Sequence, residues 1–420
     1  MLAACAGDGD PSASLPDPVV SDSAGVAIVT HPAGILSDPE GPRTSFAPDF
    51  TEGPALSIGV LEGDAAFQFT NPVGAARLAD GTIAVLDRQS RELRFFDSAG
   101  LHLRTVGGAG DGPGEFRTPV ALHHLEGDTL LVVDTQQQRL HWFSRTGDFV
   151  RDASVSSLGL DRRISVVTPD GSGGLLFLSA MAIGGDGGLP TSGRIRADVQ
   201  LIRLEAGQEA PRTVGTFPGS ETELRVASAG GEITSIEIMN LPWMALLLSA
   251  PATDGMWTAD GVTQDLFLRG VAPGSGTTPT TVARVVRFSD PPRPFDAAVR
   301  DTIEQAELDA ATDEATRGAL RERHRTLEYP ATVPPVADLF GDREGRLWIA
   351  PSILPFRRLP SGLGRDVQDW LVLDGEGLAL GWVTFPDRGR PLWASDEGLL
   401  RVRFDELDVP YVEWWPTQGR

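Results

Sequence analysis

One segment of the chain occurs twice at a fixed offset, and this repeat constrains the fold more than any other feature. Each repeated position is separated from its counterpart by 47 residues. The first copy comprises Asp64, Phe69, Pro72, Asp87, Leu93, Phe96 and Gly100, and the second comprises Asp111, Phe116, Pro119, Asp134, Leu140, Phe143 and Gly147. Units of roughly 40–50 residues are typical of the four-stranded blades of a β-propeller. The repeat therefore predicts an all-β propeller.

The number of turn signals predicts the number of blades. In an antiparallel blade, the two inner strands meet at a tight turn, where an acidic residue followed by glycine supplies the positive φ that hairpins need. Such turns lie between apolar runs at Asp80-Gly81, Glu126-Gly127, Asp170-Gly171, Asp254-Gly255, Glu344-Gly345 and Glu397-Gly398. These six turns predict a six-bladed propeller.

The last blade lacks a strand at its own end of the chain. Its strands are expected at 391–394, 399–404 and 409–415, after which the chain ends. Residues 54–59 precede Asp64 as residues 103–107 precede Asp111, so they are expected to supply the missing outermost strand. Pairing both ends of the chain in one blade removes exposed sheet edges. Residues 26–30 are a candidate for a further strand at the same place.

A helical insertion interrupts the pattern between the fourth and fifth blades, at about 296–328. Val299, Ile303, Ala306 and Ala310 recur at helical spacing, and Pro294 and Pro330 bound the segment. Two interpretations are open. The insertion either packs over an exposed edge, or it forms a lid or a partner-binding helix at the mouth of the channel.

Charge argues against two classes of partner. The formal net charge is −22, from 58 acidic and 36 basic residues. A field of this sign repels nucleic acid and anionic membrane surfaces. No run of about 18 apolar residues is present, so no membrane-spanning helix is expected. Membrane contact is expected only through a lipid anchor, and a monomer is expected.

The single cysteine provides the evidence for that anchor. Leu2-Ala3-Ala4-Cys5 is similar to the lipobox of bacterial lipoproteins, in which the cysteine thiol is lipidated. Only four residues precede Cys5, fewer than a signal peptide needs. The start codon is then assigned too far downstream, or the chain is trimmed; an accidental cysteine is the alternative. Residues 1–24 are interpreted as a truncated signal and flexible tether, and residues 25–420 as the propeller. This predicts a lipid-anchored protein of the cell envelope, either periplasmic or on the cell surface.

Two motifs carry a resemblance to a known family. The stretch from Gly81 to Gly100 has the family's strand, aspartate, polar loop and Phe-Asp-x-x-Gly turn, and Gly107 to Pro119 has its blade-linking motif. On these residues the chain resembles the NHL-repeat class of six-bladed propellers (NHL/TolB-like), and most of all the uncharacterised bacterial six-bladed β-propeller lipoproteins. Later blades match only in turn spacing and in Trp257 and Trp348 on their second strands. The resemblance implies the fold; the family carries no single activity.

Few residues qualify as site candidates. Asp87 and Asp134 close a strand and open a loop, where a carboxylate accepts backbone N–H groups, so a structural role is predicted. His123 and His124 lie on the expected innermost strand of the second blade, with side chains on opposite faces, so they cannot bind one metal together. One of them is expected to face the channel. Asn240 is expected near an inner strand, and is the third channel-facing candidate.

No cofactor is predicted from these residues. Lactonase-like propellers hold Ca²⁺ with Glu, Asn and Asp, and lyase-like NHL propellers hold Zn²⁺ with His, and neither set is recognisable in this sequence. The function favoured by the sequence is a binding or scaffolding module for a protein, peptide or carbohydrate. The alternative is a metal-dependent hydrolase or lyase with Ca²⁺ or Zn²⁺ in the central channel.

Overall fold

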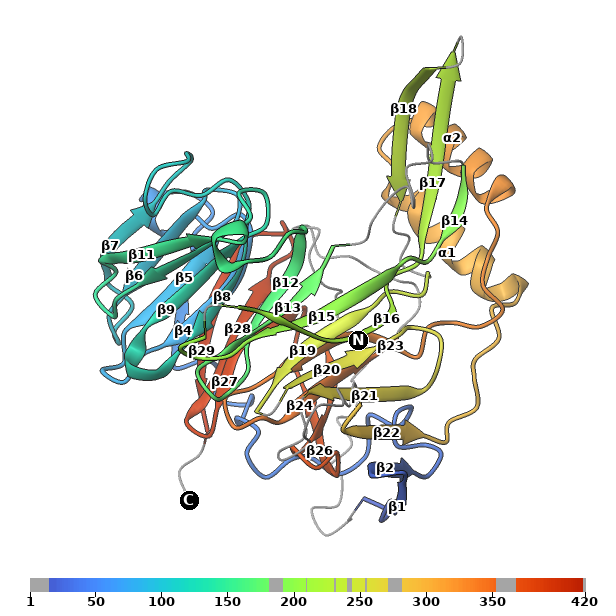
Figure 1. The fold of residues 1–420 in the computed structure, drawn as a ribbon, viewed down its shortest axis with the longest axis horizontal. Coiled ribbons are helices and arrows are strands. Elements are labelled where there is room, and N and C mark those ends of the chain that lie inside the picture. Colours follow the sequence, from blue (N-terminus) through green and yellow to red (C-terminus); the bar gives the residue numbers. More distant parts are fainter. Residues whose placement is uncertain are drawn as a thin grey trace, which may run out of the picture.

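The structure is a computed structural model. It describes residues 15–180, 192–208, 210–229, 232–239, 244–253, 255–270, 282–352 and 368–417. Within these ranges the chain forms seven β-sheets and two α-helices (Figure 1). The predicted all-β character is therefore observed, with the helices confined to one insertion.

Six of the described sheets contain a run of four antiparallel strands, and we number these sheets in chain order. The first sheet consists of β4 (Pro72–Arg77), β5 (Ile83–Asp87), β6 (Glu92–Phe96) and β7 (His102–Gly107). The second consists of β8 (Pro119–His124), β9 (Leu130–Asp134), β10 (Arg139–Phe143) and β11 (Phe149–Ser154). The third consists of β12 (Ile164–Pro169), β13 (Leu175–Ser179), β15 (Asp198–Leu204) and β16 (Arg212–Pro218).

The remaining three sheets of this kind complete the set. The fourth contains β19 (Leu248–Ala252), β20 (Gly255–Ala259), β21 (Asp265–Gly270) and β22 (Arg284–Phe288), extended by β2 (Val26–His31) and β1 (Val19–Ser23). The fifth consists of β23 (Val336–Gly341), β24 (Leu347–Pro351), β25 (Asp369–Leu373) and β26 (Ala379–Thr384). The sixth consists of β27 (Gly389–Ser395), β28 (Gly398–Phe404), β29 (Pro410–Pro416) and β3 (Leu56–Ile58).

Each sheet packs on the next through buried apolar side chains. One cluster joins the sixth, first and second sheets through Leu392, Ala75 and Leu122. Four further clusters join consecutive sheets from the second to the sixth, through Leu140 with Ile164, Leu178 with Met256, Leu268 with Leu347, and Trp370 with Leu399. The core therefore lies between neighbouring sheets, where large side chains from both faces interdigitate.

The predicted structural role of the repeated aspartates is confirmed. Asp134 Oδ2 accepts the N–H groups of Arg117 and Thr118, and its Oδ1 accepts those of Gln136 and Gln137. Asp87 makes the equivalent four bonds one repeat earlier, to Thr70, Asn71, Gln89 and Ser90. Each carboxylate is buried and joins the entry of one strand to the exit of the next. The repeat therefore encodes a backbone clamp.

Residues 19–58, the N-terminal segment, pair with or pack on the outer strands of the fourth, fifth and sixth sheets. The prediction for residues 54–59 is confirmed, because β3 pairs antiparallel with β29 in the sixth sheet. The further strand was predicted at the wrong place: β2 pairs in parallel with β22, in the fourth sheet. Between the two, Thr44 N–H donates to the Trp382 carbonyl of the fifth sheet, and Phe50 packs on Trp415 of the sixth. An apolar strand fits any unpaired sheet edge, so its sequence alone does not select which edge it covers.

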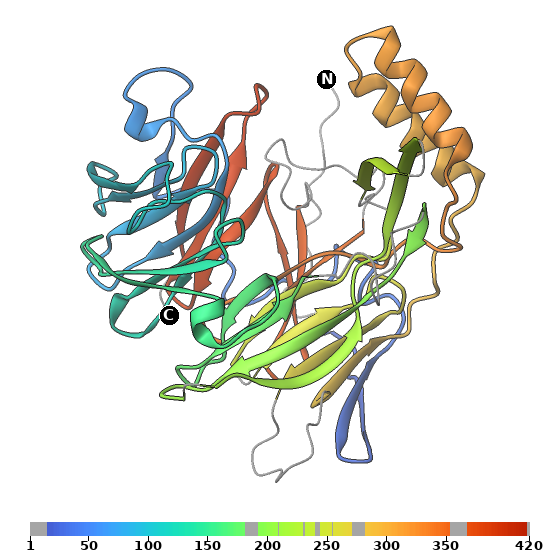
Figure 2. The same cartoon turned by 45° about the horizontal axis from the view of Figure 1, so that its top comes forward.

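The insertion between β22 and β23 holds two helices, α1 (Ala297–Ala310) and α2 (Glu314–Thr326). Val299 and Ile303 of α1 are buried against Phe295, Val333 and Met244. A three-stranded sheet of β14 (Gly193–Ile195), β17 (Thr222–Ala229) and β18 (Glu232–Met239) was not foreseen from the sequence. We call it the arm. Figures 1 and 2 show the arm and the helices projecting from the same side of the molecule.

The strand order places these additions on one face. In an antiparallel meander, the turns after the first and third strands lie at one end, and the connections to the next sheet lie at the other. The helices and the hairpin of β17 and β18 are inserted in connections between sheets. They therefore belong to the face opposite the turns that join first and second strands.

Candidate functional site

A cavity of about 1020 Å³ is lined by the first strand of each of the six sheets. Residues of β4, β8, β12, β19, β23 and β27 line it, together with turns that follow β8, β12, β19 and β23. Those turns place the mouth on the face opposite the helices and the arm. The helices therefore lie away from this rim of the cavity.

Small residues let the six strands converge. Gly74, Ala75, Ala121, Ala252 and Ala394 line the wall. A Cβ on Gly74 would lie 2.7 Å from the Cβ of Leu122 on the neighbouring strand, closer than two carbon atoms approach. Glycine at this position thus permits the close contact between β4 and β8.

Three turns are locked together at the rim. Thr253, after β19, lies between Gly171 of the third sheet and Gly345 of the fifth, and a Cβ on either glycine would overlap with it. Both glycines have positive φ, 73° and 78°, as the sequence predicted for these turns. The rim is therefore fixed across three consecutive sheets.

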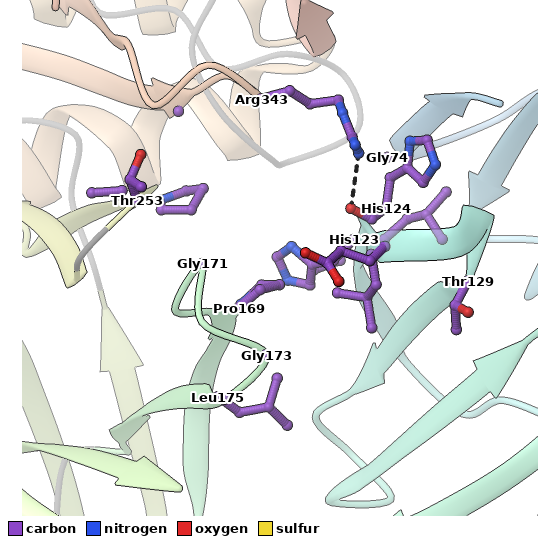
Figure 3. Close-up of a pocket in the computed structure, with 18 of the residues that line it drawn as sticks. Gly74, His123, His124, Thr129, Pro169, Gly171, Gly173, Leu175, Thr253 and Arg343 are labelled. Atoms are coloured by element: carbon purple, nitrogen blue, oxygen red, sulfur yellow. Dashed lines mark hydrogen bonds between the residues drawn. The ribbon is translucent and has the colours of Figure 1, made fainter. Parts of the chain in front are cut away.

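His123 lies on β8 and lines the cavity (Figure 3). Its Nε2 bonds the carbonyl oxygen of Val167, at 2.8 Å. A carbonyl only accepts, so Nε2 carries the proton and Nδ1 carries a lone pair. Burial lowers the pKa of His123 to about 4. The imidazole is consequently neutral at pH 7, and Nδ1 can accept a hydrogen bond.

His124 also lines the cavity, but its ring points in another direction (Figure 3). Its Nε2 bonds Asp128 Oδ1 at 2.8 Å, and the Asp128 carboxylate in turn accepts the N–H of Ala79. Burial lowers the pKa of His124, and the positive charge of Arg343 lowers it further. This side chain joins the second sheet to the first and is held in a structural contact.

The other sequence candidates cannot be placed. Cys5 and Asn240 lie outside the described residues. Among the described residues, no group of three or more His, Cys, Asp or Glu side chains is arranged to hold a metal ion. Neither described α-helix has the length and apolar character required to cross a bilayer.

Arg343 is the site residue that the sequence reasoning missed. It follows β23 in the turn of the fifth sheet, and its Nη1 donates to the carbonyl oxygen of His124, in the second sheet, at 3.0 Å (Figure 3). Its backbone N–H donates to Ala394 of the sixth sheet. A signal was present, because Arg343 directly precedes the Glu344-Gly345 turn, and such turns surround the channel of a propeller.

Four-stranded meanders arranged around a central cavity define a β-propeller-like protein.

No family model matches the chain, and no curated protein matches it. Among solved structures it is similar to a Bacteroides fragilis protein described as exported, at 10% identity and a TM-score of 0.44, covering 93% of this chain and 100% of that one. A gluconolactonase from Xanthomonas campestris matches at 11% identity and a TM-score of 0.40, covering 88% and 99%. A virginiamycin B lyase from Staphylococcus aureus matches at 9% identity and a TM-score of 0.38, covering 85% and 97%. At this distance, activity has to be argued from the site itself.

Proposed function

We propose that this protein is a six-bladed β-propeller that binds its ligand in the central cavity. The observation that carries the proposal is the cavity itself, about 1020 Å³ and lined by every first strand. Ligand sites in proteins are concave, largely apolar and equipped with a few fixed polar groups, and they occupy about 300–1,000 Å³. His123 and Arg343 are such groups here. The ligand class is a small molecule, or the end of a peptide or carbohydrate chain.

Two contacts support a closed ring, and a closed ring would make the site rigid and preformed. The sixth and first sheets share one apolar cluster, and β3 from the N-terminal part pairs with β29 near the C-terminus. With the six sheets as blades, the arm is an addition to the ring. A preformed cavity loses little conformational freedom on binding, and this favours affinity.

The test is binding with a blocked cavity. Ser249 lines the cavity on β19, so Ser249→Trp should fill it, whereas Ser21→Trp places the same side chain on the exposed strand β1. Isothermal titration would use galacturonate, its methyl ester, trialanine and trialanine amide. At least one probe should bind the wild type and Ser21→Trp with equal affinity, and Ser249→Trp not at all. Equal binding by all three proteins, or by none, would overturn the proposal.

We also propose that the propeller is tethered outside the cytoplasm by lipid on Cys5. Its support is the Leu2-Ala3-Ala4-Cys5 sequence. Metabolic lipid labelling in a bacterial host, with the chain expressed behind a lipoprotein signal peptide, should modify the wild type, and Cys5→Ser should be released in soluble form. A serine variant that stays bound to the membrane would contradict the anchor.

A metal-dependent hydrolase or lyase is the second candidate, and His123 is the observation that favours it. A neutral imidazole with a lone pair toward a cavity can act as a base, or as a zinc ligand. If this candidate is correct, the purified protein should contain a stoichiometric divalent metal, and His123→Gln should lose it.

A further inference from the structure

Arg343 presents an incompletely bonded guanidinium at the mouth of the cavity. Its side chain extends from the fifth sheet to the His124 carbonyl of the second, which fixes its position (Figure 3). A guanidinium has five N–H donors. One is used in this bond, and the residue is exposed, so the others are available to a ligand.

Arg343 also differs from Arg346, its neighbour in the same turn, in having no carboxylate partner among the described residues. Arg346, in the same turn, forms ion pairs with Asp342, Glu344 and Asp396. Within the described part of the chain, no acidic side chain lies within ion-pair distance of Arg343. The two arginines of this turn therefore differ in their partners. The charge of Arg346 is balanced by carboxylates inside the fold, whereas the charge of Arg343 at the cavity has no carboxylate partner among the described residues.

The local charge selects among anions. Glu126, Glu205 and Asp342 also line the cavity, and the chain as a whole carries −22. Asp342 and Glu205 are already paired with arginines, and the second cation of the lining, Arg151, lies over the Trp142 ring. A monoanion is therefore matched by the one guanidinium at the mouth, whereas the second charge of a dianion such as sulfate would be left uncompensated in an acidic protein. The fork of a guanidinium fits the two oxygens of a carboxylate.

Building on the proposed function, we propose that Arg343 anchors a carboxylate group of the ligand. His123 contributes the neighbouring contact, because it directly precedes the residue whose carbonyl holds Arg343, and its Nδ1 accepts a hydrogen bond. The ligand class is therefore a small monocarboxylate with a hydroxyl or N–H donor near the acid. A sugar acid and the C-terminal end of a short peptide both present this chemistry.

Arg343→Gln and Arg343→Lys test the anchor in the same titration. The carboxylate probe that binds, galacturonate or trialanine, should lose about 10- to 100-fold in affinity in Arg343→Gln. Arg343→Lys should recover part of the loss, since lysine restores the charge without the fork. The matching methyl ester or amide should bind the wild type weakly and should be insensitive to the substitution. Arg145→Gln, on an exposed outer turn, is the matched control and should bind as the wild type does.

The outcomes separate this inference from the function it builds on. If a carboxylate probe binds the wild type and Arg343→Gln equally well, while Ser249→Trp abolishes binding, the cavity is the site and the anchor is wrong. Displacement of the probe by sulfate at equal concentration would overturn the preference for a monoanion. Absence of all binding would overturn the proposed function together with the anchor. If the sugar acid binds, the carboxylate comes from a carbohydrate; if trialanine binds, it comes from the C-terminal end of a peptide. Thermal melts of each variant exclude unfolding as the cause of a loss.

Discussion

Single carboxylates hold the repeat together. Asp134 accepts four backbone N–H groups at 2.6 to 2.9 Å, and replacement by alanine would leave these donors without a partner. We expect Asp134→Ala to lower the free energy of unfolding by about 3–5 kcal/mol, as for the loss of a buried charged hydrogen-bonding group. Urea denaturation would measure the change. Asp161→Ala is the control, because the Asp161 side chain is 90% exposed. Similar losses for both variants would contradict the clamp.

Buried histidines make stability depend on pH. His141 is fully buried, and burial lowers its pKa to about 4. In the unfolded chain, the His141 imidazole becomes protonated near pH 6.5, whereas in the folded chain it becomes protonated only near pH 4. The free energy of unfolding therefore falls as the pH falls from about 6.5 to about 4. The maximum slope is about 1.4 kcal/mol per pH unit for one histidine.

His141→Phe should remove that dependence. The ring packs edge-on against Phe116 at 5.2 Å, a contact that phenylalanine can retain. The stability of the variant relative to the wild type should rise between pH 7 and pH 4.5, measured by urea denaturation at each pH. At pH 8 the His141 imidazole is neutral in both the folded and the unfolded chain. The difference in free energy of unfolding between variant and wild type at that pH therefore reports packing alone. A difference that is constant with pH would contradict a neutral buried His141.

At the scale of elements, the N-terminal strand is an integral part of the sixth sheet. Deleting residues 1–59 removes β1, β2 and β3 and exposes the edges of β22 and β29. We expect this truncation to aggregate or to melt well below the parent in a thermal scan. Deletion of residues 1–17, which ends before β1 begins, should cost little. Equal melting temperatures for the two truncations would show that the sheet does not need β3.

The helical insertion should be separable from the ring. Phe295 N–H donates to Ala331 and Val333 N–H donates to Arg293, so the two ends of the insertion are already joined. Val299 and Ile303 are the buried apolar residues of its helices, and each contributes about 1.5–3 kcal/mol at most. Replacing residues 296–327 by a short Gly/Ser linker should therefore leave a folded ring, measured by circular dichroism. Because the helices lie on the opposite face, cavity binding should persist. A chain that fails to fold would place these helices in the core.

The elements also show how far sequence reasoning reaches. Repeats, turn glycines and β periodicity are local signals, and they located the clamps, the turns and β3. The partner of β2 depends on which sheet edge is free, and the sequence of β2 does not specify that edge. The arm is formed by connecting segments that have no counterpart in the repeat, so it was not predictable either. At the site, strand alternation indicated that one of His123 and His124 faces the channel, without selecting which. Arg343 was missed because its role arises from two sheets whose contact lies 219 positions apart in sequence.

For the whole molecule, the first strands of six four-stranded sheets line one cavity, which we propose as the ligand site. Consecutive sheets share apolar clusters, small residues allow the first strands to converge, and the turns beyond them carry the charged groups. Additions to the ring, the arm and the helices, lie at the other face. This division assigns ligand binding to the cavity and leaves the added elements dispensable for it.

A crystal structure with the tightest-binding probe tests that assignment most directly. We expect electron density for the ligand inside the cavity, with its carboxylate within hydrogen-bond distance of the Arg343 guanidinium and a donor group near His123 Nδ1. Ligand density on the arm, on the helices or at another surface, with the cavity holding only solvent, would contradict it.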